Sequence, residues 1–268
     1  MLRLPAVSGA FYPAEPHALT SLIHKYVSPD PLMERRSVRA CLVPHAGYIY
    51  SGSVAGAVFA RISLPKRIIV LGVRHFPYGE EAAILSRGVW RTPLGDAPID
   101  GELAARVSQS CELLLEDPLA HESEHSLEVQ LPFLQVLDPG FKFVPIALGT
   151  LNYNALVAVG KSLGKILAEE PDVLLLTTTD LNHYENQSTT IRKDNLAVEK
   201  ILQLDAAGLY EICHRERISM CGLGPTVAML TALRQVGATN ATLVKHATSA
   251  DYSHDTKKVV GYAGFLFS

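Results

Sequence analysis

Three histidines follow short apolar segments that have the composition of β-strands. His45 comes two residues after segment 38–43, His75 comes two residues after segment 67–73, and His183 follows segment 172–179. In open α/β sheets, ligands bind at the carboxyl ends of the strands, so these side chains are expected to meet at one edge of a sheet. Imidazole is a common ligand of transition metals. The sequence therefore predicts a metal site made of two histidines and a third, anionic group.

Two residues can supply this third group. Asp180 lies three residues before His183, and Cys221 lies just ahead of a helix predicted to begin at Pro225 or Thr226. A helix N-terminus lowers the pKa of a thiol and favours the thiolate, which is the form that binds metal. Cys221 is thus expected to be the reactive cysteine, and the alternative is a small buried apolar residue. The four cysteines form no Cys-x-x-Cys pair and are predicted to be reduced: Cys41, Cys111, Cys213 and Cys221.

A competing motif lies at His121-Glu122-Ser123-Glu124-His125, which matches the zinc-peptidase pattern His-Glu-x-x-His. That pattern requires both imidazoles on one face of a buried helix. Pro118 and the polar run before His125 instead indicate the entrance of a helix, which argues against a peptidase. The prediction is that Ser123 or Ser126 caps this helix, and that Glu128 or His125 faces the metal pocket.

The glycine-containing segment 47–53 is loosely similar to a phosphate-binding loop. It lacks the Gly-Lys-Ser/Thr ending of a nucleotide site. The segment is expected to turn the chain after His45 and to bring Tyr48 and Tyr50 to the wall of the cleft. The alternative is that these tyrosines pack over the core.

The elements that must position these residues alternate along the chain. Apolar, β-branched segments predict strands, and segments with helical spacing lie between them. The expected fold is α/β, a single domain over residues 1–268, with a largely parallel or mixed central sheet and helices on both faces. The predicted strands are 38–43, 67–73, 82–85, 141–148, 172–179, 241–245 and 259–267, and the predicted helices are 53–62, 101–110, 126–137, 154–169, 191–204 and 226–236.

The composition of the 268 residues excludes several classes of function. The formal net charge is -3 and the basic residues are not gathered, so nucleic acid is not an expected ligand. No segment has the apolar length of a membrane span or the pattern of a secretory signal, so no membrane association is expected and the expected location is the cytoplasm.

Six short motifs in order along the chain resemble the motif set of the Memo family. This resemblance covers the chain from about Arg3 to near its C-terminus. The fold of that family resembles the class III extradiol dioxygenases, which hold non-haem iron with two histidines and a carboxylate. The motifs are Ser8-Gly9-Ala10-Phe11-Tyr12-Pro13, Pro44-His45-Ala46-Gly47-Tyr48 with Ser51-Gly52, Leu71-Gly72 with His75, Glu124-His125-Ser126-Leu127-Glu128, Asp180-Leu181-Asn182-His183 and Cys221-Gly222.

The resemblance implies His45, His75 and Cys221 as metal ligands, because a cysteine of the Memo proteins stands where the dioxygenases have the carboxylate. It places Asp180 and His183 beside the metal as acid/base groups. The expected cofactor is Fe(II) or Cu(I), one per chain. The resemblance also implies a radical-SAM partner protein, since bacterial and archaeal relatives are often encoded beside one in the AmmeMemoRadiSam arrangement.

This sequence departs from the common family pattern before the second histidine, where it has Val73 and Arg74, and at Tyr252-Ser253-His254-Asp255. Both departures concern the substrate pocket. Two functions of different classes follow: a redox metalloprotein acting as a dioxygenase-like oxidoreductase, or an adaptor that binds a peptide or a protein in the same cleft. Phosphate recognition favours an arginine cluster, and the cleft is expected to offer only Arg74. Its ligand is expected to be a small molecule or a peptide.

Overall fold

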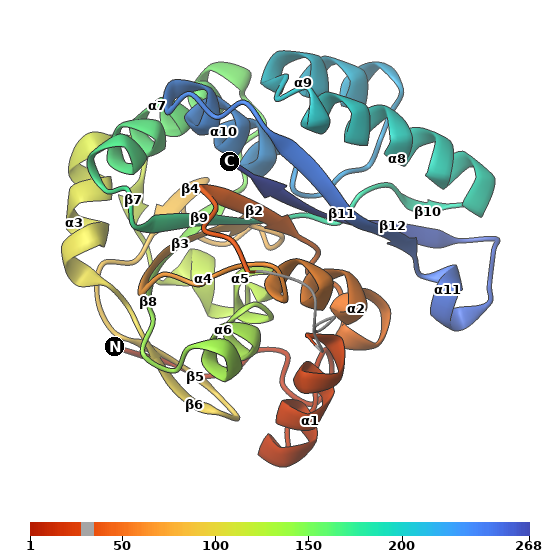
Figure 1. Ribbon diagram of the computed structural model, residues 1–268. Coiled ribbons are helices and arrows are strands. Elements are labelled where there is room, and N and C mark those ends of the chain that lie inside the picture. Colours follow the sequence, from red (N-terminus) through yellow and green to blue (C-terminus); the bar gives the residue numbers. More distant parts are fainter. Residues whose placement is uncertain (28–34) are drawn as a thin grey trace.

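The computed structural model describes residues 1–27 and 35–268 (Figure 1). Within these residues, the main sheet has nine strands, eight of them in the order β10-β12-β2-β9-β3-β8-β4-β7, with β11 paired to β12. Four neighbouring strands at its centre are parallel: β2 (Ala40–Val43), β9 (Val173–Thr178), β3 (Arg67–Val73) and β8 (Lys142–Leu148). The flanking strands are β4 (Ala82–Ile84), β7 (Leu115–Glu116), β10 (His183–Glu185), β11 (Ala241–Thr248) and β12 (Val259–Phe267).

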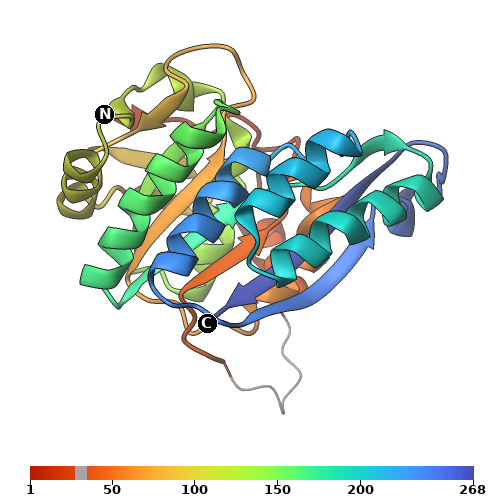
Figure 2. The ribbon, with the colours of Figure 1, turned by 90° about the horizontal axis from the view of Figure 1, so that it is seen from above.

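Helices cover both faces of this sheet, as Figures 1 and 2 show. Alternate residues of β3 belong to opposite cores, since Ile69 packs in one and Ile68 in the other. One face carries α3 (Gly101–Ser110), α7 (Tyr153–Glu169), α8 (Gln187–Leu202), α9 (Ala206–Arg215) and α10 (Leu223–Gln235). The other carries α1 (Pro16–Tyr26), α2 (Tyr48–Phe59), α5 (His125–Glu128) and α6 (Leu131–Leu137).

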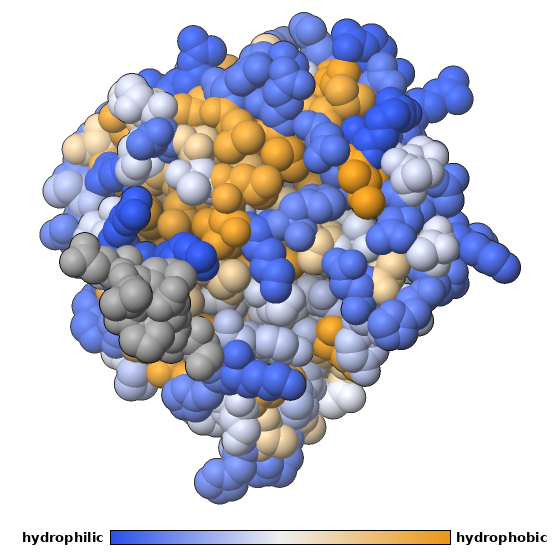
Figure 3. All heavy atoms as spheres, turned by 45° about the vertical axis from the view of Figure 1, so that its right-hand side comes forward, coloured by the Kyte–Doolittle hydropathy of each residue, from blue (hydrophilic) through white to orange (hydrophobic). Residues whose placement is uncertain are grey.

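A second, small sheet contains the N-terminus. Its strands are β1 (Leu2–Arg3), β5 (Val89–Thr92) and β6 (Gly95–Pro98), and β1 runs parallel to β5. Two short helices complete the described chain: α4 (Leu119–Glu122) and α11 (Ala250–Ser253). On the face shown in Figure 3, hydrophilic residues surround an area where apolar residues gather. No described helix combines the length and apolar character needed to cross a bilayer.

The structure confirms the α/β fold with a mixed sheet flanked by helices. It differs from the sequence prediction at 126–137, where two helices replace one. Pro132 lies at the start of α6, since proline has no N–H to continue a helix. The elements outside the predicted ranges are helices α1, α4, α9 and α11 and strands β1, β5, β6, β7 and β10.

The parallel order β2-β9-β3 positions the chemistry. Val43 at the end of β2 pairs with Thr178 at the end of β9, and β3 pairs with the other side of β9. The polar segments that follow these three strands therefore leave the same edge of the sheet side by side.

Candidate metal centre

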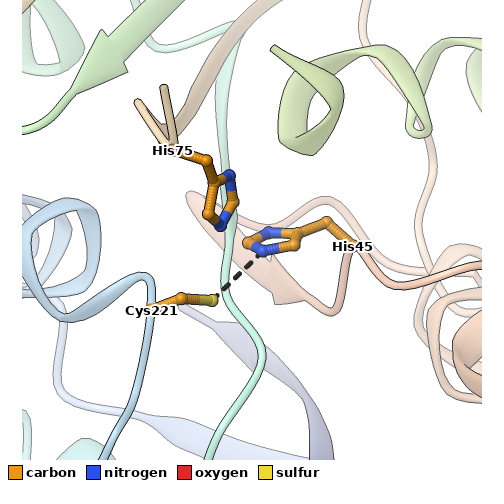
Figure 4. Close-up of side chains that lie close together, drawn as sticks. All are labelled: His45, His75 and Cys221. Carbon is orange, nitrogen blue, oxygen red and sulfur yellow. Dashed lines mark hydrogen bonds between the residues drawn. The ribbon is translucent and has the colours of Figure 1, made fainter. Parts of the chain in front are cut away.

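His45, His75 and Cys221 meet at this edge (Figure 4). His45 follows β2, His75 follows β3, and Cys221 lies two residues before α10. The sulfur of Cys221 is 3.1 Å from Nε2 of His45, and one ligand atom from each residue lies within 4.8 Å of the others. The two imidazole rings are perpendicular, with centroids 5.1 Å apart. The three side chains can therefore reach one ion.

His45 is held from two sides and is 1% exposed. Its ring Nδ1 hydrogen-bonds with the hydroxyl of Thr178 at 2.9 Å, and its backbone N–H donates to a carboxylate oxygen of Asp180 at 2.9 Å. Burial, together with the neighbouring His75, holds the pKa of His45 well below its usual range. The ring is therefore neutral at neutral pH, and Nε2 carries the lone pair when Nδ1–H donates to the Thr178 hydroxyl.

His75 is oriented by Glu124, a residue whose role the sequence did not reveal. The Glu124 carboxylate accepts the backbone N–H of His75 at 2.6 Å and lies 2.9 Å from its Nδ1. Burial would raise the pKa of Glu124, but the hydrogen bonds and charge of His75 and the charge of His125 outweigh it and lower this pKa to about 2. The ionised carboxylate therefore accepts a hydrogen bond from the Nδ1–H of His75 and leaves Nε2 free for a metal.

Cys221 contacts the backbone of the segment that follows β9. The Asp180 N–H donates to the sulfur at 3.3 Å. Burial and the charge of Asp180 raise the pKa of the Cys221 thiol. The expectation of a lowered thiol pKa is thus wrong for the metal-free protein, because enclosure outweighs the field at the start of α10. Cys221 is nevertheless the one cysteine that is not fully buried.

Asp180 contacts two of the three candidate ligands, and His183 lies against Ser219, two residues before the third. Asp180 is 4% exposed and links His45 to Cys221 through the two hydrogen bonds described above, and burial raises its pKa. His183 begins β10, where its Nδ1 lies 2.8 Å from the carbonyl of Ser219. Since a carbonyl only accepts, Nδ1 of His183 carries a proton, and Nε2 takes no part in this contact with Ser219.

His125 joins the same group of rings. It stacks on His75 at 4.5 Å between centroids and lies 5.7 Å from His45. Burial first, and then the neighbouring His45, lower the pKa of His125 to about 4. The sequence placed either His125 or Glu128 at the pocket, and the structure brings His125 there.

Glu128 requires a correction, because its carboxylate binds the N-terminal segment. It forms an ion pair with Arg3 at 2.7 Å and accepts the hydroxyl of Tyr12 at 2.6 Å. Tyr48, expected at the cleft wall or in the core, is a core residue that is 2% exposed, and its hydroxyl donates to the carbonyl of Val129. Neither side chain is part of the metal cluster.

Arg74 also differs from its predicted place in the pocket. Its guanidinium donates to the carbonyls of Tyr78 and Gly79, at 3.2 and 2.9 Å. Arg74 therefore holds the turn that follows His75, and the arginine expected for anion recognition is engaged by its own loop.

The His-Glu-x-x-His motif does not form a peptidase site. His121 lies in α4, which ends at Glu122, His125 begins α5, and Ser123 and Glu124 separate the two helices. His121 is fully buried, bonds the carbonyl of Asp117 through Nδ1 and packs edge-on against Trp90. The two imidazoles are therefore not on one helical face.

The donor set suits a borderline or soft metal. Both ligand histidines have Nδ1 engaged by an oxygen group of the protein, an arrangement that fixes the ring and directs Nε2 to the ion. A sulfur completes a three-residue group that leaves further coordination positions open. Among the described residues, one other group of potential ligands occurs, His75 with Glu124 and His125, and it shares His75 with the first.

Comparison with known proteins adds the family. Residues 3–266 match the family of Memo-like proteins. The chain belongs to the Memo family. It is 40% identical to a MEMO1 family protein of Methanopyrus kandleri, covering 100% of this chain and 99% of that one, and 38% identical to one of Caldivirga maquilingensis, covering 99% and 98%.

A solved structure supports the fold of this Memo protein. An uncharacterized protein from Escherichia coli K12 aligns with a TM-score of 0.55 over 84% of this chain and 99% of that chain, at 12% identity. At this identity the likeness concerns the fold alone. The candidate metal site of the Memo chain therefore rests on its own geometry.

Proposed function

We propose that this protein is a redox metalloprotein that binds one iron or copper ion through His45, His75 and Cys221. The observation that supports the proposal is that Nδ1 of His45 is hydrogen-bonded to Thr178 and Nδ1 of His75 to Glu124. The Nε2 atoms of both rings are then left for an ion beside the Cys221 sulfur. Bound there, the ion supplies electron transfer and open positions for a substrate. A thiolate gives the ion more charge than a carboxylate, which favours Cu(I) and weakens Lewis acidity.

The neighbouring residues supply proton transfer. His183 keeps its proton on Nδ1, bound to Ser219, so Nε2 can accept a proton from a substrate. Asp180 is enclosed, and its raised pKa makes this carboxyl easier to protonate than an exposed one. We infer that these two residues move protons while His45, His75 and Cys221 hold the ion.

The first test is metal analysis of protein purified anaerobically without chelators. We expect about one iron or copper ion per chain, and loss of most of that metal in His45→Ala and His75→Ala. His24→Ala, on the exposed side of α1, is the matched control and should keep the metal. Retention of metal by both ligand variants, with circular dichroism showing an intact fold, would contradict the proposal.

The redox role is tested separately from binding. Oxygen consumption by the metal-loaded protein in the presence of a reductant should be lost in His45→Ala. Peptide binding that is equal with and without metal, with no metal-dependent oxygen consumption, would instead support the adaptor function.

A further inference from the structure

The N-terminal segment is anchored beside the metal centre by one buried cation. Arg3 is 3% exposed, and its guanidinium lies 4.0 Å from the ring centre of Trp90. Its Nε donates to the carbonyl of His121, and its Nη2 donates to the carbonyl of Glu124, both at 2.7 Å. Its Nη1 donates to the carboxylate of Glu128 at 2.7 Å. Arg3 thus fixes the backbone on both sides of the α4–α5 junction.

Glu128 binds the rest of the same segment, residues 2–12, which we call the N-terminal strap. Its carboxylate accepts the backbone N–H groups of Ala6 and Val7, at 2.8 and 3.1 Å, and the hydroxyl of Tyr12. The Arg3–Glu128 pair is buried on both sides. Removing one partner of a buried pair leaves an uncompensated charge, so the strap depends on both residues.

The strap reaches the two segments that carry the histidine ligands. Glu124, whose carbonyl Arg3 binds, uses its side chain to hold both the backbone and the ring of His75. At the other end of the strap, the carbonyl of Phe11 accepts the N–H of Tyr48 at 2.7 Å, three residues after His45. The ring of Phe11 lies 4.9 Å from that of His125.

We propose that Arg3 is a positioning residue of the metal centre, which acts through Glu124 on the orientation of His75. This inference rests on the proposed function, since it assigns Arg3 a role at that same site. Arg3 touches neither ligand. Its hydrogen bond sets the position of the Glu124 backbone, and that position decides whether the Glu124 carboxylate can accept a hydrogen bond from Nδ1 of His75.

The test compares Arg3→Met with Arg67→Met. Arg67 lies at the opposite end of β3 from His75 and pairs with Asp100 at 2.7 Å, so its loss removes an ion pair without touching the strap. Co(II) is the probe, because its absorption reports ligand geometry. We expect Arg3→Met to bind Co(II) at least about 10-fold more weakly and to show an altered spectrum at saturation. Arg67→Met should match the wild type in both.

A metal-free measurement separates this inference from the proposed function. The Nδ1–H proton of His75, bound to Glu124, should give a protected NMR signal in the wild type and in Arg67→Met, and should exchange faster in Arg3→Met. If the wild type binds no Co(II), the proposed function fails, while this signal still decides the role of Arg3.

Two results would overturn the role of Arg3. One is a protected His75 signal in Arg3→Met with an unchanged Co(II) spectrum. The other is an equal loss of affinity in both arginine variants at equal loss of stability, because that would reduce the effect of Arg3 to general destabilisation. If Arg3→Met does not fold, Arg3→Lys takes its place. Lysine keeps the charge, but its single nitrogen cannot reach the three acceptors that Arg3 binds through three separate nitrogens, and the same outcomes then apply.

Discussion

The three proposed ligand residues are held by different numbers of contacts. His45 is enclosed. Its ring is hydrogen-bonded to Thr178 at the end of β9, and its backbone is hydrogen-bonded to Asp180 just after that strand. The side chain of His75 is 26% exposed, and the Glu124 carboxylate holds both its backbone and its ring. His75 is therefore the ligand whose position depends most on a single partner.

Glu124→Gln should lower the affinity for metal about 10- to 100-fold, as loss of an outer partner of a ligating histidine does. The amide is neutral and accepts the Nδ1 proton of His75 less strongly. Competition against a chelator measures the change. Glu116→Gln is the control, because the carboxylate of Glu116 accepts the backbone N–H of Ser86 at the surface. An unchanged affinity in Glu124→Gln would show that His75 is held by other contacts.

Metal binding should become tighter as the pH rises. Burial and Asp180 raise the pKa of the Cys221 thiol, so the metal-free protein carries this proton at neutral pH and must release it to the solvent on binding. The affinity is then expected to increase about tenfold per pH unit in the neutral range. Titration in buffers of different ionisation enthalpy counts the proton, and Cys221→Ser should remove most of this dependence.

At the scale of residues, the sequence predicted where the histidines lie better than it predicted their hydrogen-bond partners. A histidine directly after an apolar strand is visible in one dimension, because strand ends share an edge. The contact between Glu124 and His75 joins the residue before α5 to the segment after β3 across 49 residues, and no local pattern encodes it. The prediction that Glu128 could face the metal pocket was wrong for the same reason, since its partners come from the N-terminal strap.

The start of α10 is packed directly onto the end of β9. A Cβ on Gly222 would lie 2.4 Å from Cβ of Thr179 and 2.5 Å from the carbonyl oxygen of Thr178. The Gly222 N–H also donates to the Thr179 hydroxyl at 2.9 Å. This close approach is what brings Cys221 to the histidines.

Gly222→Ala should therefore destabilise the protein by about 2 kcal/mol, because backbone atoms cannot move aside as a flexible side chain does. It should also weaken metal binding, since the shift displaces Cys221. Urea unfolding and metal titration measure the two effects. Gly140→Ala, where the added methyl would meet the flexible end of Lys66, is the control and should change stability by no more than about 0.5 kcal/mol.

The elements themselves were predicted well where both faces are buried. The strand predicted at 67–73 is β3 with the same bounds. A continuous apolar segment in an α/β chain is typical of a central strand that is buried on both faces. The helix predicted at 126–137 is interrupted, and Pro132 was the available signal for this break. The small sheet was not predicted, since β1 is two residues long.

At the scale of the whole molecule, buried neutral histidines make stability depend on pH. Burial is the main cause that lowers the pKa of both His121 and His125 to about 4, against 6.5 for a free histidine. Between these values the unfolded chain binds more protons than the folded one. The free energy of unfolding should therefore fall as the pH is lowered from about 6.5 to about 4.

His121→Gln tests this dependence away from the metal ligands. It should flatten the fall in stability by up to about 1.4 kcal/mol per pH unit, the contribution of one proton. Urea unfolding at several pH values gives the slope. His24→Gln on the exposed side of α1 should leave the slope as in the wild type. A slope that is equal in both variants would mean that His121 keeps no lowered pKa in the folded state.

The ligands come from both halves of the chain, and this has a consequence during biosynthesis. His45 and Cys221 are 176 positions apart, and β2 pairs on one side with β12, the last of the described strands in the sequence. A nascent chain that ends before residue 221 holds two ligands without the third. If the proposed site binds a metal, a chain that stops before residue 221 lacks one of its three ligands, and truncated products of interrupted translation should not retain the ion.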